Sequence, residues 1–254
     1  MKFFERLYLG MIYLFLYVPI FVLIVYSFNA SRYAMGWSGF SLEWYERLFK
    51  NTSLLDAALN SVSIAFFSAT VATLLGTIGA VAIFRYHFAG KQFLKSMVYV
   101  LILSPEIVMG IALLILFVLV GVKLGFVSLL IAHITFCLPF VVVTVLSRLA
   151  GFDRSVIEAA KDLGASGFYT FSHIILPSIL PAVIAGFLLS FTLSLDDVII
   201  SFFVSGVEFE ILPIKIYSMV RLGVKPEINA LCTIMFAVTI VLVFVSQLLL
   251  KERK

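Results

Sequence analysis

The chain has 254 residues, of which 63% are hydrophobic and 13% are charged. Soluble domains are nearer half apolar and a quarter charged, so this composition, with a mean hydropathy of +1.16, excludes an ordinary soluble protein. The formal net charge is +4, and the distribution of the basic residues along the chain explains this charge without a nucleic-acid partner.

Six apolar stretches are long enough to cross a bilayer, which takes roughly 20 residues per helix. They are residues 7–28, 57–84, 96–120, 125–147, 178–204 and 228–250, and none of them contains Lys or Arg. The first exceeds the usual apolar core of a signal peptide, so we expect it to be retained as a helix. The sequence therefore predicts an all-α polytopic membrane protein with six transmembrane helices in a single domain, residues 1–254.

The orientation follows from the basic residues. If both termini are cytoplasmic, 11 of the 18 Lys and Arg residues fall in inner loops and 7 in outer loops. This excess matches the tendency of Lys and Arg to remain on the cytoplasmic side. We therefore predict two cytoplasmic termini.

An outer segment, residues 29–56, separates the first two predicted spans and is rich in aromatic residues. Ser41 is placed to cap a short helix over residues 42–49. The aromatic residues fit either an interfacial belt or a lid over the outer mouth.

The long inner loop between spans four and five predicts two short helices. Ser155 and Glu158 form an S-x-x-E capping box that would start the first helix. Gly164 would end it, because a C-terminal turn favours positive φ. Ser166 is placed to cap the second helix, which Pro177 would stop or bend.

This loop, residues 148–177, resembles the EAA signature of the permeases of binding-protein-dependent ABC importers. The matching residues are Glu158-Ala159-Ala160, Gly164 after three residues, and then Ile174, Leu176 and Pro177. Because the six spans match as well, the resemblance covers the whole chain. It implies the type I ABC importer permease fold.

In that family the first short helix of the loop couples the permease to an ATPase. Small Ala159 and Ala160 would permit close approach, and Gly164 would make the turn that presents the helix. Glu158 has two candidate roles, a local cap or an ion pair with a basic residue of the ATPase. The sequence has no G-x-x-x-x-G-K-[ST] phosphate loop. We therefore expect the chain to be no enzyme and to hold no cofactor, with ATP and Mg bound by the partner ATPase.

Three carboxylates, Glu106, Asp196 and Asp197, lie inside the predicted spans. An ionised acid at the bilayer centre costs at least about 2.5–3.5 kcal/mol, so such residues are candidates for function. On continuous helices, Pro105 would only loosen the turn before Glu106, and the adjacent aspartates would point about 100° apart. One aspartate would then meet substrate and the other would tie its helix to a neighbour. Ser194 adds a hydroxyl to the same helix.

Further motifs resemble the spermidine and putrescine permeases within this family. They include Tyr17-Val18-Pro19-Ile20, Leu42-Glu43-Trp44-Tyr45, Pro105-Glu106 and Ser194-Leu195-Asp196-Asp197. Glu106 departs from the expected aspartate, which keeps the charge and lengthens its reach by one methylene. The carboxylates would hold ammonium groups, and Tyr17 and Trp44 would line the substrate path through cation–π contacts. For both aromatics, packing in a core or belt is an equally open interpretation.

The resemblance also implies partners. A complete importer would contain two copies of a cytoplasmic ABC ATPase, a second homologous permease and a soluble substrate-binding protein, assembled in a bacterial inner membrane. No metal site is predicted, since Cys137 and Cys232 both lie in apolar spans.

Two other functions are compatible with parts of the sequence. The same machinery could import an amino acid, an opine or ferric ion. A proton-coupled secondary carrier could instead use the acids as relays, but no histidine lies near them in local spacing, and we interpret His133 as a hydrogen-bonded packing residue. Uptake without ATP would identify such a carrier.

Overall fold

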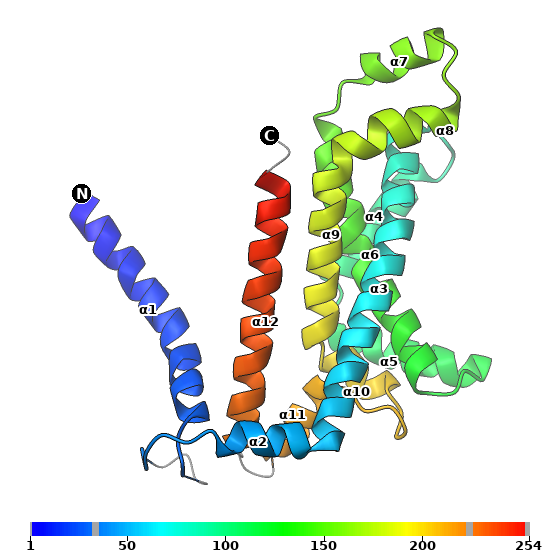
Figure 1. The fold of residues 1–254 in the computed structure, drawn as a ribbon. Helices are drawn as coiled ribbons and strands as arrows, with labels where there is room; N and C mark the ends of the chain where they lie inside the picture. The colour runs from blue at the N-terminus through cyan, green and yellow to red at the C-terminus, as the bar shows by residue number, and fades with distance from the viewer. Residues whose placement is uncertain (1, 32–35, 222–225, 252–254) are drawn as a thin grey trace. The chain divides into compact units, whose positions relative to one another are not determined.

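The computed structural model describes residues 2–31, 36–221 and 226–251. Within them the regular secondary structure is helical, apart from an isolated β-bridge between Asn29 and Phe40. The helices, labelled in Figure 1, are α1 (Lys2–Ser27), α2 (Glu43–Lys50), α3 (Thr52–Arg85), α4 (Lys91–Leu103), α5 (Glu106–Val120), α6 (Phe126–Ala150), α7 (Arg154–Asp162), α8 (Gly167–Tyr169), α9 (Leu176–Asp196), α10 (Ile199–Val204), α11 (Leu212–Arg221) and α12 (Pro226–Lys251). A π-helical segment, η1 (Thr170–Ile175), joins α8 to α9.

The chain divides into two compact units. The first comprises Met1–Asp56 and Lys215–Lys254, and the second comprises Ala57–Ile214. Within the first unit, α12 packs against α1 and α2. Within the second, α6 is the central helix and packs against α4, α9 and α10, while α10 also packs against α5.

Four helical stretches among the described residues are long and apolar enough to cross a membrane. They are Phe4–Ser27, Thr52–Arg85, Phe126–Ala150 and Gly167–Asp196. A fifth results if the bent pair Lys91–Leu103 and Glu106–Val120 is one span. The all-helical membrane class is thus confirmed with four or five spans.

The third predicted span, residues 96–120, is broken. Ser104 is extended, with φ −70° and ψ 134°, and the helices on either side of the break are bent by 110°. Proline disfavours the α conformation in the residue before it and lacks the N–H that would continue the helix. The expectation that Pro105 only loosens one continuous helix is therefore wrong.

The fifth predicted span, residues 178–204, is also broken. Helix α9 ends at Asp196, and Asp197 is extended, with φ −64° and ψ 121°. The expectation of one regular helix through both aspartates is wrong, because the Asp197 side chain bonds the backbone of the next helix instead of leaving its own residue in α9.

Helix α6 forms the core of the second unit. Its buried residues include Leu129, Cys137 and Val141, all fully inaccessible. Two glycines on neighbouring helices let the backbones approach Val141: a Cβ at Gly76 would lie 2.8 Å from Val141 Cβ, and one at Gly186 would lie 3.4 Å from Val141 Cγ1. Small residues at such crossings are the usual device for close packing of membrane helices.

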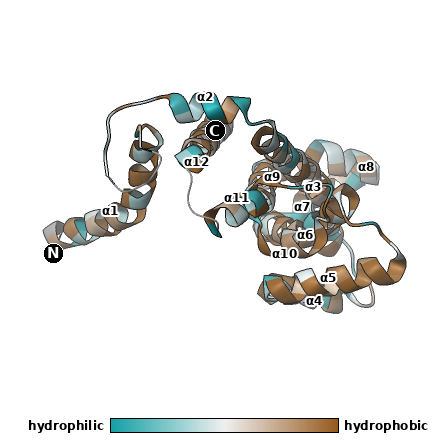
Figure 2. Ribbon diagram, turned by 90° about the horizontal axis from the view of Figure 1, so that it is seen from below, coloured by the Kyte–Doolittle hydropathy of each residue, from teal (hydrophilic) through white to brown (hydrophobic). Residues whose placement is uncertain are grey.

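In the first unit, α2 is amphipathic. Trp44 and Leu48, one turn apart, are its buried residues, and Figure 2 shows α2 alternating between hydrophilic and hydrophobic colours while α5 is hydrophobic along its length. The Glu43 N–H donates to Ser41 Oγ (3.1 Å). The predicted short helix is therefore present but begins at Glu43, one residue later than predicted. Its N-cap is Leu42, which makes no side-chain cap, and Ser41 bonds the first helical amide from one position earlier.

Candidate functional site

Glu106, Asp196 and Asp197 line one cavity of about 290 Å³ in the second unit. Glu106 and Asp196 are exposed, whereas Asp197 is buried, with 6% of its surface accessible. They meet because both helix breaks lie here: Glu106 is the first residue of α5, Asp196 is the last residue of α9, and Asp197 lies between α9 and α10. The broken helices thus bring together carboxylates that are 90 residues apart in sequence.

The chemistry of this cavity favours a cation with apolar segments. Its other lining residues are apolar, and no basic residue is among those described there; they are Phe136, Leu193, Val198 and Ile199. Asp196 also lies at the C-terminus of α9, where the partial negative charge of a helix end adds to that of the carboxylate. The aromatic ring of Phe136 offers a further surface for ammonium or methylene groups.

Asp197 is engaged with the protein. Its Oδ2 accepts hydrogen bonds from the Ser201 N–H (2.8 Å) and from Ser201 Oγ (2.8 Å), and its Oδ1 accepts from the Ile200 N–H (3.3 Å). It therefore caps the first turn of α10, where the amides have no partner within the helix. Of the adjacent aspartates, Asp196 is the exposed residue.

His133 connects this cap to the core. Its Nδ1 lies 2.6 Å from Ser194 Oγ and its Nε2 lies 2.9 Å from Ser201 Oγ, while Ser194 Oγ lies 3.0 Å from Ser68 Oγ. One neutral tautomer, with hydrogen on Nε2, satisfies this chain: Ser194 donates to Nδ1, Nε2–H donates to Ser201, and Ser201 donates to Asp197. The network joins α3, α6, α9 and α10 and fixes the position of Asp197.

This network includes residues that sequence reasoning missed. His133 Nε2 lies 3.6 Å from Asp197 Oδ2, although the two residues are 64 positions apart in the sequence. The interpretation of His133 as a hydrogen-bonded packing residue is confirmed, since it is fully buried and both ring nitrogens have partners. The contact between His133 and Asp197 could not be predicted from the spacing of residues along the sequence.

Tyr17 and Trp44 belong to the first unit. Trp44 is buried, with 3% of its surface accessible, and its Nε1–H donates to the Asn29 carbonyl (2.6 Å). Tyr17 is exposed on α1 and its ring stacks on Tyr13, with centroids 6.3 Å apart. The burial of Trp44 favours the packing interpretation for this residue.

The first short helix of the inner loop is α7, and its cap differs from the prediction. Asp153 is the N-cap, and its carboxylate accepts the Ser155 N–H (2.9 Å). Ser155 and Glu158 are therefore within the helix, and the predicted capping box is wrong, because an aspartate two residues earlier serves as the cap. The hydrogen bond from Ser155 lowers the pKa of the Asp153 carboxyl.

The end of α7 agrees with the prediction. Gly164 has φ +81°, its N–H donates to the Lys161 carbonyl (2.8 Å), and the Ala165 N–H donates to the Ala160 carbonyl (2.9 Å). This pair of bonds is the Schellman arrangement, which requires a left-handed residue that glycine adopts without strain.

The EAA residues of α7 have different surroundings. Glu158 and Ala159 are exposed, while Ala160 and Ile157 are buried. Next to them, Leu163 is 89% exposed. Ala159, Ala160 and Leu163 line a hollow of about 670 Å³, so the loop presents an apolar concave surface together with an unpaired carboxylate among the described residues.

The second short helix is continuous with α9. Ser166 caps it, as predicted, by accepting the Tyr169 N–H (3.2 Å). The chain then passes through η1 into α9, with Pro177 at the second residue of α9. Pro177 therefore lies in the first turn of α9, where proline is tolerated. Figure 1 shows the helix bending between α8 and α9.

Comparison with known proteins gives one family and close relatives. Residues 72–254 match the family described as "Binding-protein-dependent transport system inner membrane component". The "Spermidine/putrescine transport system permease protein PotC" of Haemophilus influenzae is 54% identical over 250 residues, covering 98% of this chain and 97% of that protein. Its namesake from Escherichia coli K12 is 58% identical over 242 residues, covering 95% and 92%.

The fold also matches a solved transporter. A bacterial ABC transporter involved in the import of the acidic polysaccharide alginate superposes with a TM-score of 0.76 over 99% of this chain and 95% of that one, at 16% identity. At this identity the likeness concerns the fold alone.

Proposed function

Because this chain belongs to the family of binding-protein-dependent transport system inner membrane components, we propose that it is the permease subunit through which an ABC importer takes up spermidine and putrescine. The observation that carries the substrate class is the cavity that joins Glu106, Asp196 and Asp197, with no basic residue among the described residues that line it. The names and the identity of the two curated relatives support the same substrates.

A polyamine fits this cavity by its chemistry. Each ammonium group needs a carboxylate or a helix C-terminus, and each methylene segment favours an apolar wall. Asp196 and Glu106, which are exposed, are the proposed contacts for ammonium groups. Asp197 and Ser194 are proposed to hold the helices around the cavity in place, since both belong to the hydrogen-bonded network with His133.

The chain works as part of a complex. We infer two copies of a cytoplasmic ABC ATPase, which bind ATP and Mg, a second homologous permease and a soluble substrate-binding protein that delivers the polyamine. The location is a bacterial inner membrane, with both termini cytoplasmic. The exposed Glu158 and Ala159 of α7 and the turn at Gly164 are the proposed contact with the ATPase.

Six spans are part of this proposal. The bent pair α4 and α5 would count as the third span and α12, whose Pro226–Val241 is apolar, as the sixth. The helical stretch Gly167–Asp196 runs from the inner loop to the acidic cavity without interruption, about 45 Å at 1.5 Å per residue. A movement of the ATPase at the loop would therefore reach Asp196 through one helix.

Uptake of radiolabelled spermidine and putrescine tests the substrate. Cells that lack their own polyamine importers and carry this chain with its proposed partners should accumulate both compounds. This uptake should stop when ATP is depleted. Failure with both polyamines, in the presence of competent partners, rejects the polyamine proposal. Uptake that persists without ATP and collapses with an uncoupler alone would identify a proton-coupled carrier instead.

Substitutions of the exposed carboxylates test the role of the acidic cavity. Asp196→Asn should lower kcat/KM for spermidine by roughly 10- to 100-fold, because a hydrogen bond to a charged group is lost. Glu106→Gln should act in the same direction. Asp56→Asn removes an exposed acid that does not line the cavity and should leave uptake unchanged. An Asp196→Asn permease with normal uptake would remove Asp196 from the substrate path.

A further inference from the structure

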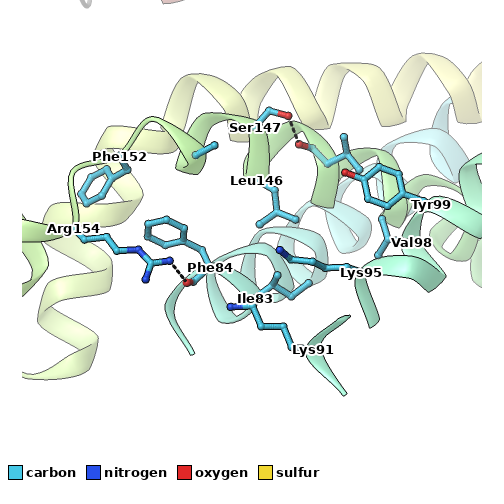
Figure 3. A pocket seen from close by; sticks show the side chains of 12 residues that line it. Ile83, Phe84, Lys91, Lys95, Val98, Tyr99, Leu146, Ser147, Phe152 and Arg154 are labelled. Carbon is cyan, nitrogen blue, oxygen red and sulfur yellow. Dashed lines mark hydrogen bonds between the residues drawn. The ribbon is translucent and has the colours of Figure 1, made fainter. Parts of the chain in front are cut away.

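A second polar cavity lies at the C-terminal end of α6. It has a volume of about 600 Å³ and is lined by residues of α3, α4, α6 and the start of α7. Figure 3 shows its basic residues, Lys91, Lys95 and Arg154, with the ammonium ends of both lysines directed to the side on which Phe84 and Arg154 lie. No acidic residue is among the described residues that line it. The cavity therefore has a net positive charge.

The basic side chains of this pocket use only some of their hydrogen-bond donors within the protein. Lys91 Nζ donates one hydrogen bond, to the Tyr86 carbonyl (3.0 Å), which leaves two of its three donors. Lys95 is half-buried, and its ammonium makes no hydrogen bond or ion pair with the described residues. Arg154 donates to the Phe84 carbonyl (3.2 Å) and stacks over the Phe84 ring, 4.7 Å from its centroid. Arg154 is thus anchored, and the lysines remain available to a ligand.

The helix that carries the lysines adds to the positive field. Lys91 is the first residue of α4, and its N-cap, Gly90, supplies no side-chain cap. The N-terminus of a 13-residue helix contributes a partial positive charge and amides without helical acceptors. The partial charge of this helix end has the same sign as the charges of the two lysines.

Apart from Ser147 and the Tyr99 hydroxyl, the remaining wall of the pocket is apolar, and most of it lies along α4 and α6. Val98 is buried and Tyr99 is exposed on α4, while Val143, Leu146 and Ala150 come from α6. A free inorganic phosphate has no apolar group that could pack against this wall. A phospholipid has a phosphate for the lysines and an acyl chain for the apolar side.

We propose that this pocket binds the phosphate headgroup of an anionic phospholipid. The proposal rests on the membrane location of the chain and not on its transported substrate. Because Phe152 and Arg154 belong to the wall of the pocket, and Arg154 is the first residue of α7, the bound lipid contacts the base of the proposed coupling helix. Lipid binding at this point would hold α7 against the ends of α3 and α6.

Native mass spectrometry of the purified full-length chain tests the proposal. The chain is titrated with palmitoyl-oleoyl phosphatidylglycerol, with the zwitterionic phosphatidylcholine of the same acyl chains, and with sodium phosphate as a competitor. We expect tighter binding of phosphatidylglycerol than of phosphatidylcholine, and no displacement of the lipid by millimolar phosphate. The Lys91→Gln/Lys95→Gln variant should bind phosphatidylglycerol about 10- to 30-fold more weakly, since each cation near an anionic headgroup contributes roughly a factor of five.

Matched variants separate the pocket from general charge and from folding. Lys50→Gln/Lys123→Gln removes the same charge outside the pocket and should bind normally. Lys91→Arg/Lys95→Arg should retain binding, and Ala150→Phe, which keeps every cation and fills part of the apolar wall, should weaken it. Equal binding of both lipids, or equal loss in the two Gln double variants, would overturn the proposal. Displacement by inorganic phosphate would assign the pocket to a soluble phosphate instead.

Discussion

At the scale of single residues, two adjacent aspartates have different environments. Asp196 ends α9 with an exposed side chain, while Asp197 is buried and caps α10. The difference arises from the extended backbone at Asp197, which turns its carboxylate toward the amides of Ile200 and Ser201. The pair therefore divides into one proposed ligand and one positioning residue.

Removal of the Ser201 hydroxyl tests the buried network. Ser201→Ala deletes the acceptor of His133 Nε2–H and a donor to Asp197, so we expect a loss of about 1–3 kcal/mol in the free energy of unfolding, measured by thermal unfolding in detergent. Ser190→Ala is the control, because the buried Ser190 Oγ has no partner among the described residues. Equal stability of the two variants would show that the network contributes nothing.

The cap of α7 predicts a pH dependence. Hydrogen bonding lowers the pKa of Asp153 in the folded state, so its contribution to helix stability is complete above the ordinary value of about 3.9. This contribution is lost as the pH falls through the lowered pKa. Hydrogen exchange of the α7 amides, corrected for intrinsic rates, should therefore accelerate below about pH 4. In Asp153→Asn, which can cap without a charge, this acceleration should be absent; a persistent one would point to another acid.

At the scale of helices, the two breaks decide the site. Pro105 separates α4 from α5, and Asp197 separates α9 from α10. Each break places a carboxylate at a helix end instead of along a helix face, and α5 and α10 pack against each other. The acidic cavity therefore forms where the ends of these helices meet.

The crossing of α3 and α6 gives a sharp test of packing. A Cβ at Gly76 would lie 2.8 Å from Val141 Cβ and Cγ1, so Gly76→Ala should lower the free energy of unfolding by about 1–3 kcal/mol. Gly79, on the same helix, has nothing within 4 Å of such a Cβ, and Gly79→Ala should be neutral or slightly stabilising. Thermal unfolding compares the two. Equal stability of Gly76→Ala and Gly79→Ala would contradict the overlap.

At the scale of the whole molecule, Glu158 is the residue that bears on the proposed coupling to an ATPase. Glu158 lies in the interior of α7, is exposed and has no partner among the described residues. Since Asp153 is the cap, Glu158 is free of the local role that the sequence allowed. An ion pair with the ATPase is the remaining prediction for its carboxylate.

Glu158→Gln should therefore keep α7 and lower substrate-stimulated ATP hydrolysis of the reconstituted importer by about tenfold or more, since one partner of an interfacial ion pair is lost. Circular dichroism checks that the helix content is unchanged. Glu46→Gln, at an exposed acid of α2, is the control and should hydrolyse ATP normally. Normal coupling in Glu158→Gln would exclude the ion pair.

The amino-acid sequence by itself determined the membrane class, the family and the glycine turn that ends α7. Long apolar runs, the EAA spacing and the glycine at position 164 are local signals, and each depends on residues close together in the chain. The sequence also singled out Glu106, Asp196 and Asp197 as costly charges in apolar spans.

The tertiary structure alone decided which of these residues meet. The break at Asp197 depends on a cap given to the next helix, and the His133–Asp197 contact joins residues 64 positions apart. The basic pocket likewise needs α3, α4, α6 and α7 together. Hydrogen bonds and packing between distant segments leave no periodic pattern in the sequence, because their partners are set by the crossing of helices and not by spacing along one of them.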